Sequence, residues 1–215
     1  MTSEARYSVG IDLGTTNSAM ACADLTTDEA AVIEDVAIPQ LVNAGEIAER
    51  SLLPSFLYVA GEFDFPAGSL RLPWPDDDAE RWVVGEVAQK RGSENPSRLV
   101  GSAKSWLSYA GANRTSPILP WGAPQEVPKV SPVGASARYL QHLKQAWDAR
   151  FAAGQPALAL EQYEAALDLS VRHREWMLRE QFPETIGPAA SRTGEVSASA
   201  IAPAAAKITS RIAVS

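Results

Sequence analysis

The sequence has few cysteines, few histidines and no excess of positive charge. Its 215 residues include one cysteine, Cys22, which excludes a disulfide framework and is expected to be a small core residue on a strand. No run of eighteen apolar residues occurs, so no membrane span is predicted. Residues 1–20 lack a basic start followed by an apolar run, so no signal peptide is expected. We therefore predict a cytoplasmic location without a membrane partner.

The charge balance argues against one further class of partner. The formal net charge is −7, which disfavours a nucleic acid held by general electrostatics. Apolar residues make up 46% of the chain, which is enough for a hydrophobic core. Length alone allows one or two domains.

The most informative stretch is residues 7–18, Tyr-Ser-Val-Gly-Ile-Asp-Leu-Gly-Thr-Thr-Asn-Ser. Val9 and Ile11 give it the β-branched character of a strand, and Gly14 frees the backbone for a tight turn into a second strand. The alternative interpretation is an ordinary hairpin with a polar turn.

The turn also carries groups that suit a nucleotide. Thr15 and Thr16 offer two hydroxyls and successive backbone amides, and oriented amides of this kind form an anion-binding concavity. Asp12 precedes them, and its carboxylate is a suitable ligand for a hydrated magnesium ion. A carboxylate beside such an anion-binding concavity indicates a binding site for the phosphates of a magnesium nucleotide.

The sequence motif Gly-Ile-Asp-Leu-Gly-Thr-Thr-Asn-Ser resembles the first phosphate loop of the 70-kDa heat shock proteins, the DnaK-type chaperones. These belong to the ATPase superfamily of actin and hexokinase. The resemblance implies ATP and Mg²⁺ as cofactors. It implies that Asp12 organises magnesium, and that Gly14, Thr15, Thr16 and Asn17 cradle the β- and γ-phosphates.

A second match to this family lies in residues 82–107. Trp82–Ala88 is expected to be a short strand leading into a helix, and it resembles a Val-Gly-(Glu/Asp)-x-Ala segment of the family. Leu99–Leu107 resembles a family stretch that ends in Ala-Lys before an apolar pair. By this resemblance Lys104 corresponds to a lysine that reaches the γ-phosphate and the attacking water, where an ammonium stabilises developing charge. The alternative is a plain surface lysine.

The remaining pattern predicts an α/β fold. Strands are expected at Ser18–Ala23, Val32–Ile38 and Leu52–Ala60. With the family resemblance, residues 1–152 are expected to form a partial ribonuclease-H-like lobe, of the actin-like ATPase type, with a small insert subdomain.

A helix is expected to begin at Ser131-Pro132, because serine is a good N-cap and proline is tolerated at the first helical position. Apolar residues recur along it at three- and four-residue steps as far as Phe151. His142 lies near this apolar face and is expected to be packed or half-exposed rather than catalytic. The acidic run 76–78 is interpreted as a solvated surface rather than a metal cluster.

The resemblance ends near residue 151. Residues 153–186 are expected to form a divergent helical segment with an amphipathic helix over 157–182. In residues 187–215, fourteen of the 29 residues are alanine or serine and none is aromatic, so a disordered tail is expected.

Several parts of the chaperone family have no counterpart in this sequence. The sequence shows no second phosphate loop, no Gly-Gly-rich adenosine-binding segment and no β-rich peptide-binding domain. We therefore expect an ATP-binding, DnaK-like chaperone fragment whose ancestral reaction is Mg-dependent ATP hydrolysis, weak or inactive alone. Unfolded clients and co-chaperones are expected only for a full-length version.

The sequence leaves two other functions and two origins open. The chain is alternatively a non-catalytic interaction module that docks through helix 157–182. A small-molecule kinase of the same superfamily is disfavoured by Gly-Thr-Thr-Asn-Ser and by the context of Lys104. The sequence favours a truncation, such as a frameshift near residue 153, over a genuine short protein whose second helix caps the sheet.

Overall fold

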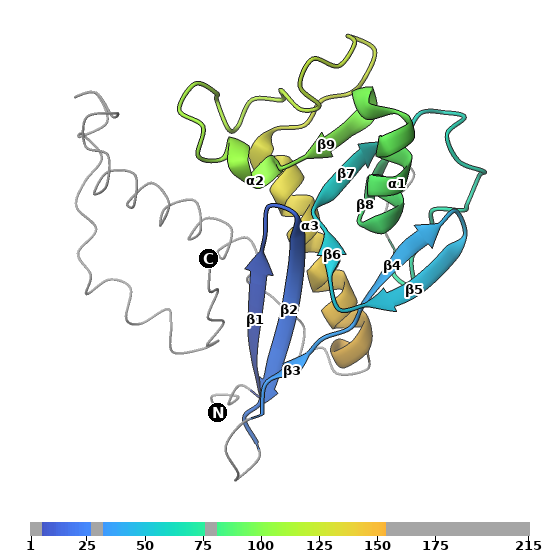
Figure 1. Ribbon diagram of the computed structural model, residues 1–215. Coiled ribbons are helices and arrows are strands. Elements are labelled where there is room, and N and C mark those ends of the chain that lie inside the picture. Colours follow the sequence, from blue (N-terminus) through green and yellow to red (C-terminus); the bar gives the residue numbers. More distant parts are fainter. Residues whose placement is uncertain (1–5, 27–31, 76–80, 154–215) are drawn as a thin grey trace, which may run out of the picture.

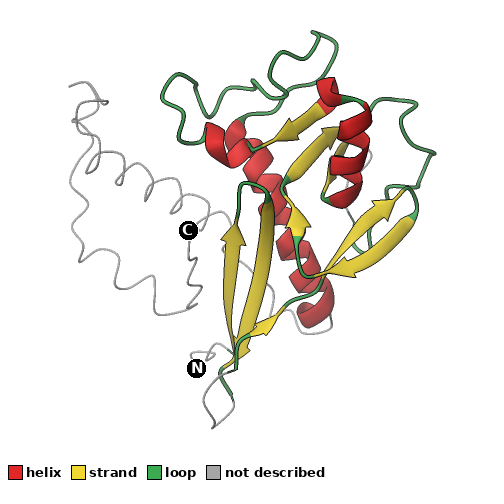
Figure 2. Cartoon of the chain, in the orientation of Figure 1, coloured by secondary structure: helices red, strands yellow, loops and turns green. Residues whose placement is uncertain are grey.

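The computed structural model describes residues 6–26, 32–75 and 81–153. They form a mixed α/β structure of small antiparallel sheets and a few helices (Figures 1 and 2). Within these ranges, no helix has the length and apolar character needed to cross a membrane.

Three expectations concern residues that fall outside this description. They are the solvated acidic run 76–78, the amphipathic helix 157–182 within segment 153–186, and the tail 187–215.

The first sheet is built on the hairpin predicted for residues 7–18. Strands β1 (Tyr7–Leu13) and β2 (Asn17–Asp24) pair antiparallel, from Tyr7 opposite Asp24 to Leu13 opposite Ser18. Two short strands also pair with β2, namely β3 (Glu34–Asp35) and β6 (Leu53–Pro54). Alternate residues of β1 are buried, as a sheet with one core-facing side requires. The strand–turn–strand prediction is therefore confirmed.

The strand predicted at Val32–Ile38 is wrong in extent. Val32 and Ile33 are 71% and 77% exposed, and the chain leaves the first sheet after Asp35. The next strands, β4 (Ile38–Asn43) and β5 (Glu46–Arg50), form a hairpin of their own. Its turn contains Gly45 with a φ of 78°, a conformation that glycine adopts without strain.

The third sheet has the order β8–β7–β9, with β8 at Trp82–Val84, β7 at Phe56–Val59 and β9 at Leu99–Gly101. The strand predicted at Leu52–Ala60 is confirmed in position. It is divided at Ser55, however, so that β6 pairs in the first sheet and β7 in the third.

Helix α1 (Glu86–Glu94) follows β8 as predicted. A side chain far away in the sequence caps its first turn, since Gln40 Oε1 accepts a hydrogen bond of 3.0 Å from the Glu86 amide. Gln40 Nε2 donates to the Leu52 carbonyl oxygen at 2.8 Å. A Cβ at Gly85, which has a φ of 91°, would lie 2.7 Å from Gln40 Oε1. The buried glutamine therefore fixes where α1 begins.

The helix predicted from Ser131-Pro132 is α3 (Pro132–Trp147), and a π-helical turn, Asp148–Ala152, follows it. Ser131 is its N-cap, because its hydroxyl accepts a hydrogen bond of 2.9 Å from the Gly134 amide. The buried side of α3 packs against β1 and β2 in the main hydrophobic core (Figure 1).

Two expectations about core residues are confirmed. Cys22 is buried on β2. His142 is 4% exposed on α3, and its Nε2 lies 2.9 Å from the Pro39 carbonyl oxygen. Trp74 meets its ring edge-on at 5.2 Å between centroids. His142 is therefore a packed side chain, as its position on the apolar face predicts.

Candidate phosphate-binding turn

The turn between β1 and β2 is closed so tightly that it requires glycine. A Cβ at Gly14 would lie 1.9 Å from the backbone oxygen of Asn17, far inside any permitted contact. Gly14 is therefore required by space, because the chain crosses back over itself at this point. The sequence indicated a glycine turn here but not this close approach.

Ser55 holds the turn from the side of the protein interior. Its hydroxyl donates to the Gly14 carbonyl oxygen at 2.9 Å, and its amide donates to the Thr16 carbonyl oxygen at 2.8 Å. Ser18 Oγ lies 3.0 Å from Ser55 Oγ, and both serines are at most 1% exposed. Because the Ser55 hydroxyl proton goes to Gly14, Ser18 donates to Ser55. Two turn carbonyls are thus fixed by a buried serine pair.

The side chains proposed to meet phosphate lie on the solvent side of this turn. Thr15, Thr16 and Asn17 are all exposed, whereas the flanking Leu13 is 4% exposed. The turn therefore presents two hydroxyls and an amide to solvent from a backbone held by buried hydrogen bonds. Such an arrangement is suited to a small anion, since little ordering remains to be done on binding.

Asp12 lies on the sheet face opposite the core. It is exposed on β1, between the buried Ile11 and Leu13, and its partner across the hairpin is Ala19. In the described ranges, no three His, Cys, Asp or Glu side chains gather to hold a metal ion. Asp12 thus offers a single carboxylate. This fits Mg²⁺, which commonly uses one or two carboxylates together with substrate phosphates and water.

Lys104 is not a plain surface lysine, because it is 6% exposed on helix α2 (Ala103–Trp106). The sheet connects its segment to the turn, since Ser55 holds the turn and the next residue, Phe56, pairs with Gly101 of β9.

The residue before α2 has an unusual backbone. Ser102 has a φ of 53° and a ψ of 33°, the one left-handed non-glycine residue in the described part of the chain. This conformation costs about 1 kcal/mol for a residue with a Cβ. Strain of this kind concentrates at functional sites, and Ser102 is the N-cap of the helix that contains Lys104.

Comparison with known proteins adds no relative. No protein-family model and no curated protein matches the chain. The likeness to DnaK-type chaperones therefore depends on the residues of the two motifs.

The structure brings some of the predicted site residues together. It also shows residues at the turn that the sequence did not predict. Gly14, Thr15, Thr16 and Asn17 share one turn, and Asp12 lies two residues before it. Sequence reasoning missed the serine pair that holds the turn. The one available signal was the polar Ser55 inside an otherwise apolar strand sequence.

Proposed function

We propose that this chain is an ATP-binding fragment of the DnaK chaperone type, and that turn 14–17 holds the nucleotide phosphates. One observation carries the proposal. The turn is fixed by Gly14 and Ser55 on its inner side while Thr15 and Thr16 face solvent on its outer side.

The residues divide the work by their chemistry. Thr15 and Thr16 donate hydroxyl hydrogen bonds to the β- and γ-phosphate oxygens, and Asn17 adds an amide. Asp12 binds the hydration shell of Mg²⁺, which when bound neutralises phosphate charge. Lys104 stabilises the charge that develops on the transferred phosphoryl group.

The fold and the partners follow from the same proposal. The antiparallel order β1–β2–β3 supports a partial ribonuclease-H-like lobe of the actin-like ATPase type. In that superfamily the nucleotide lies between two lobes, and this chain would supply part of one.

Each tenfold loss in rate corresponds to about 1.4 kcal/mol of barrier, so half a site gives weak hydrolysis or none. Clients and co-chaperones belong to a full-length version, and the cytoplasmic location stays a prediction.

The test is direct binding of a fluorescent ATP analogue, with and without Mg²⁺. We expect binding that is strengthened by Mg²⁺ and reduced about tenfold, or about 1.4 kcal/mol, by Thr15→Val with Thr16→Val. The matched control is Thr15→Ser with Thr16→Ser, which keeps both hydroxyls and should retain binding. No binding by the native chain, or equal binding by the valine variant, would refute the proposal.

A further inference from the structure

Phe63 is the most exposed large apolar side chain among the described residues, at 90%. It lies in the loop that follows β7, next to the exposed Glu62. A single exposed phenylalanine is common on protein surfaces and carries no conclusion by itself. Two further observations, on the loop that carries Phe63 and on the groove beside that loop, indicate a role for this side chain.

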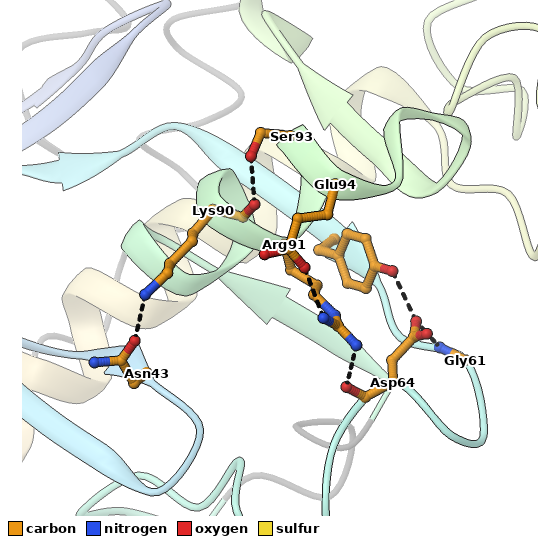
Figure 3. Close-up of polar contacts among 8 residues, drawn as sticks. Asn43, Gly61, Asp64, Lys90, Arg91, Ser93 and Glu94 are labelled. Atoms are coloured by element: carbon orange, nitrogen blue, oxygen red, sulfur yellow. Dashed lines mark hydrogen bonds and ion pairs between the residues drawn. The ribbon is translucent and has the colours of Figure 1, made fainter.

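The loop that carries Phe63 is held in a fixed conformation. The carboxylate of Asp64 accepts hydrogen bonds from the Tyr58 hydroxyl and the Gly61 amide, both at 2.7 Å. The Asp64 carbonyl oxygen accepts from Arg91 at 2.8 Å (Figure 3). Because Asp64 is bonded on both its side chain and its backbone, Phe63 projects from an ordered support. Such an anchor loses little conformational entropy when it is buried by a partner.

A groove of about 160 Å³ lies beside this loop, between the β4–β5 turn and α1. Phe65 and Val87 supply apolar surface, and the charged Lys90, Arg91 and Glu94 also line the groove. Asp64 and Phe65 belong to the loop and also line the groove. Phe63 therefore directly precedes, in the chain, two residues that line the groove.

The charges at the groove leave Lys90 as its dominant cation. Arg91 pairs with Glu94 at 2.6 Å, and it lies over the Phe65 ring at 5.5 Å. The Asp64 carboxylate accepts the hydrogen bonds from Tyr58 and Gly61. Lys90 Nζ donates to the neutral Asn43 Oδ1 at 2.5 Å, and the Asn43 amide in turn donates to Glu46 at 2.6 Å, so the direct partner of Lys90 is neutral and the Glu46 carboxylate lies one side chain away. An apolar groove with a cation beside it complements a segment in which an acidic residue precedes an aromatic one. The ring would fill the groove, and the carboxylate would pair with the cation.

We infer that this face is a contact between two copies of the chain. Phe63 of each copy enters the groove of the other, and Glu62 meets the Lys90 ammonium across the contact. A two-fold axis would form both contacts at once, because each copy carries Phe63 and the groove-lining Asp64 and Phe65 on the same loop. The contact is small and each chain carries a net charge of −7, so the dimer forms only at high protein concentration.

The first experiment is sedimentation velocity of the full chain over a wide concentration range. We expect a concentration-dependent shift from monomer to dimer, weakened at least tenfold by Phe63→Ala. The matched control is Trp121→Ala, which removes an aromatic side chain that is 68% exposed and does not line the groove. This control should leave the dimer unchanged. Circular dichroism establishes that each variant is folded.

The second experiment exchanges the two charges. Glu62→Lys alone and Lys90→Glu alone should each weaken self-association, because each homodimer then opposes like charges. A mixture of the two variants should form a dimer again, since each substituted position then faces a group of opposite charge on the other copy.

Two results would overturn the inference. One is a monomer at every concentration. The other is a dimer that is indifferent to Phe63→Ala and to the charge exchange. Both readouts are made without nucleotide, so they are independent of the proposed ATP site.

Discussion

The hydroxyl of Ser55 donates a 2.9 Å hydrogen bond to the carbonyl oxygen of Gly14, forty-one positions earlier in the chain. This contact joins the candidate phosphate turn to the point where the chain passes from the first sheet to the third. The site and the junction between sheets therefore depend on one buried side chain.

Ser55→Ala is expected to lower the free energy of unfolding by about 1–3 kcal/mol. The substitution leaves the Gly14 carbonyl and the Ser18 hydroxyl without their buried partner. The measurement is urea denaturation, with Ser69→Ala as the control. Ser69 also donates to a backbone carbonyl, that of Pro66 at 2.7 Å, but this hydrogen bond is exposed to solvent. Equal costs for the two substitutions would contradict the role given to Ser55.

Gly14→Ala tests whether the turn requires space rather than conformational freedom. The new Cβ would lie 1.9 Å from the Asn17 oxygen, so the turn has to open, and both stability and nucleotide binding should fall. Gly45→Ala is the matched control, because a Cβ there meets nothing within 4 Å and only the φ of 78° is unfavourable. That strain costs about 1 kcal/mol. A Gly14→Ala variant that loses no more stability than Gly45→Ala would show that the turn is not tight.

His142 is expected to make the stability of the chain depend on pH. Burial is the main cause that lowers its pKa from 6.5 to about 4, while the hydrogen bond to Pro39 acts in the opposite direction. The unfolded chain therefore binds more protons between these values, and stability falls as pH decreases from 6.5 toward 4. A shift of this size corresponds to about 3 kcal/mol.

The measurement is urea denaturation at several pH values across this window. His142→Gln retains a side-chain amide that can donate to the Pro39 carbonyl but does not titrate. It should flatten the decline between pH 6.5 and 4. An unchanged pH profile in this variant would mean that another group causes the loss.

The sequence predicted the elements whose signals are local. Alternating apolar residues indicated β1 and β2, and the Ser131-Pro132 cap with its apolar spacing indicated α3. It did not predict the β4–β5 hairpin. Ala44 and Gly45 form the turn of this hairpin, whereas the strand predicted at Val32–Ile38 ends at the residue where β4 begins.

Long-range partners were beyond sequence reasoning for a physical reason. Gln40 caps α1 across 46 positions, and Ser18 meets Ser55 across 37. Neither pairing leaves a trace in periodicity or composition, because each depends on how separate sheets are brought together. For the same reason, the spacing between Asp12 and Lys104 did not show whether their segments meet at one end of the fold.

Two buried tyrosines give a paired test of hydrogen bonding in the core. Tyr139 is 1% exposed and, within the described structure, its hydroxyl has no hydrogen-bond partner. Tyr58 is 0% exposed, but its hydroxyl donates to Asp64 at 2.7 Å. A buried polar group without a partner costs about 1–3 kcal/mol, whereas a bond to a carboxylate contributes about 1.5–3 kcal/mol.

Tyr139→Phe should therefore raise the free energy of unfolding by about 1 kcal/mol, and Tyr58→Phe should lower it by a similar or larger amount. Both substitutions remove one oxygen and leave the ring in place, so cavity effects nearly cancel between them. Urea denaturation at neutral pH gives both values. If Tyr139→Phe is destabilising, its hydroxyl is satisfied in solution by a water molecule, because a bridging water recovers most of a direct hydrogen bond.

Tyr58→Phe should also loosen the loop that carries Phe63 and weaken self-association, an effect that Tyr139→Phe should not have.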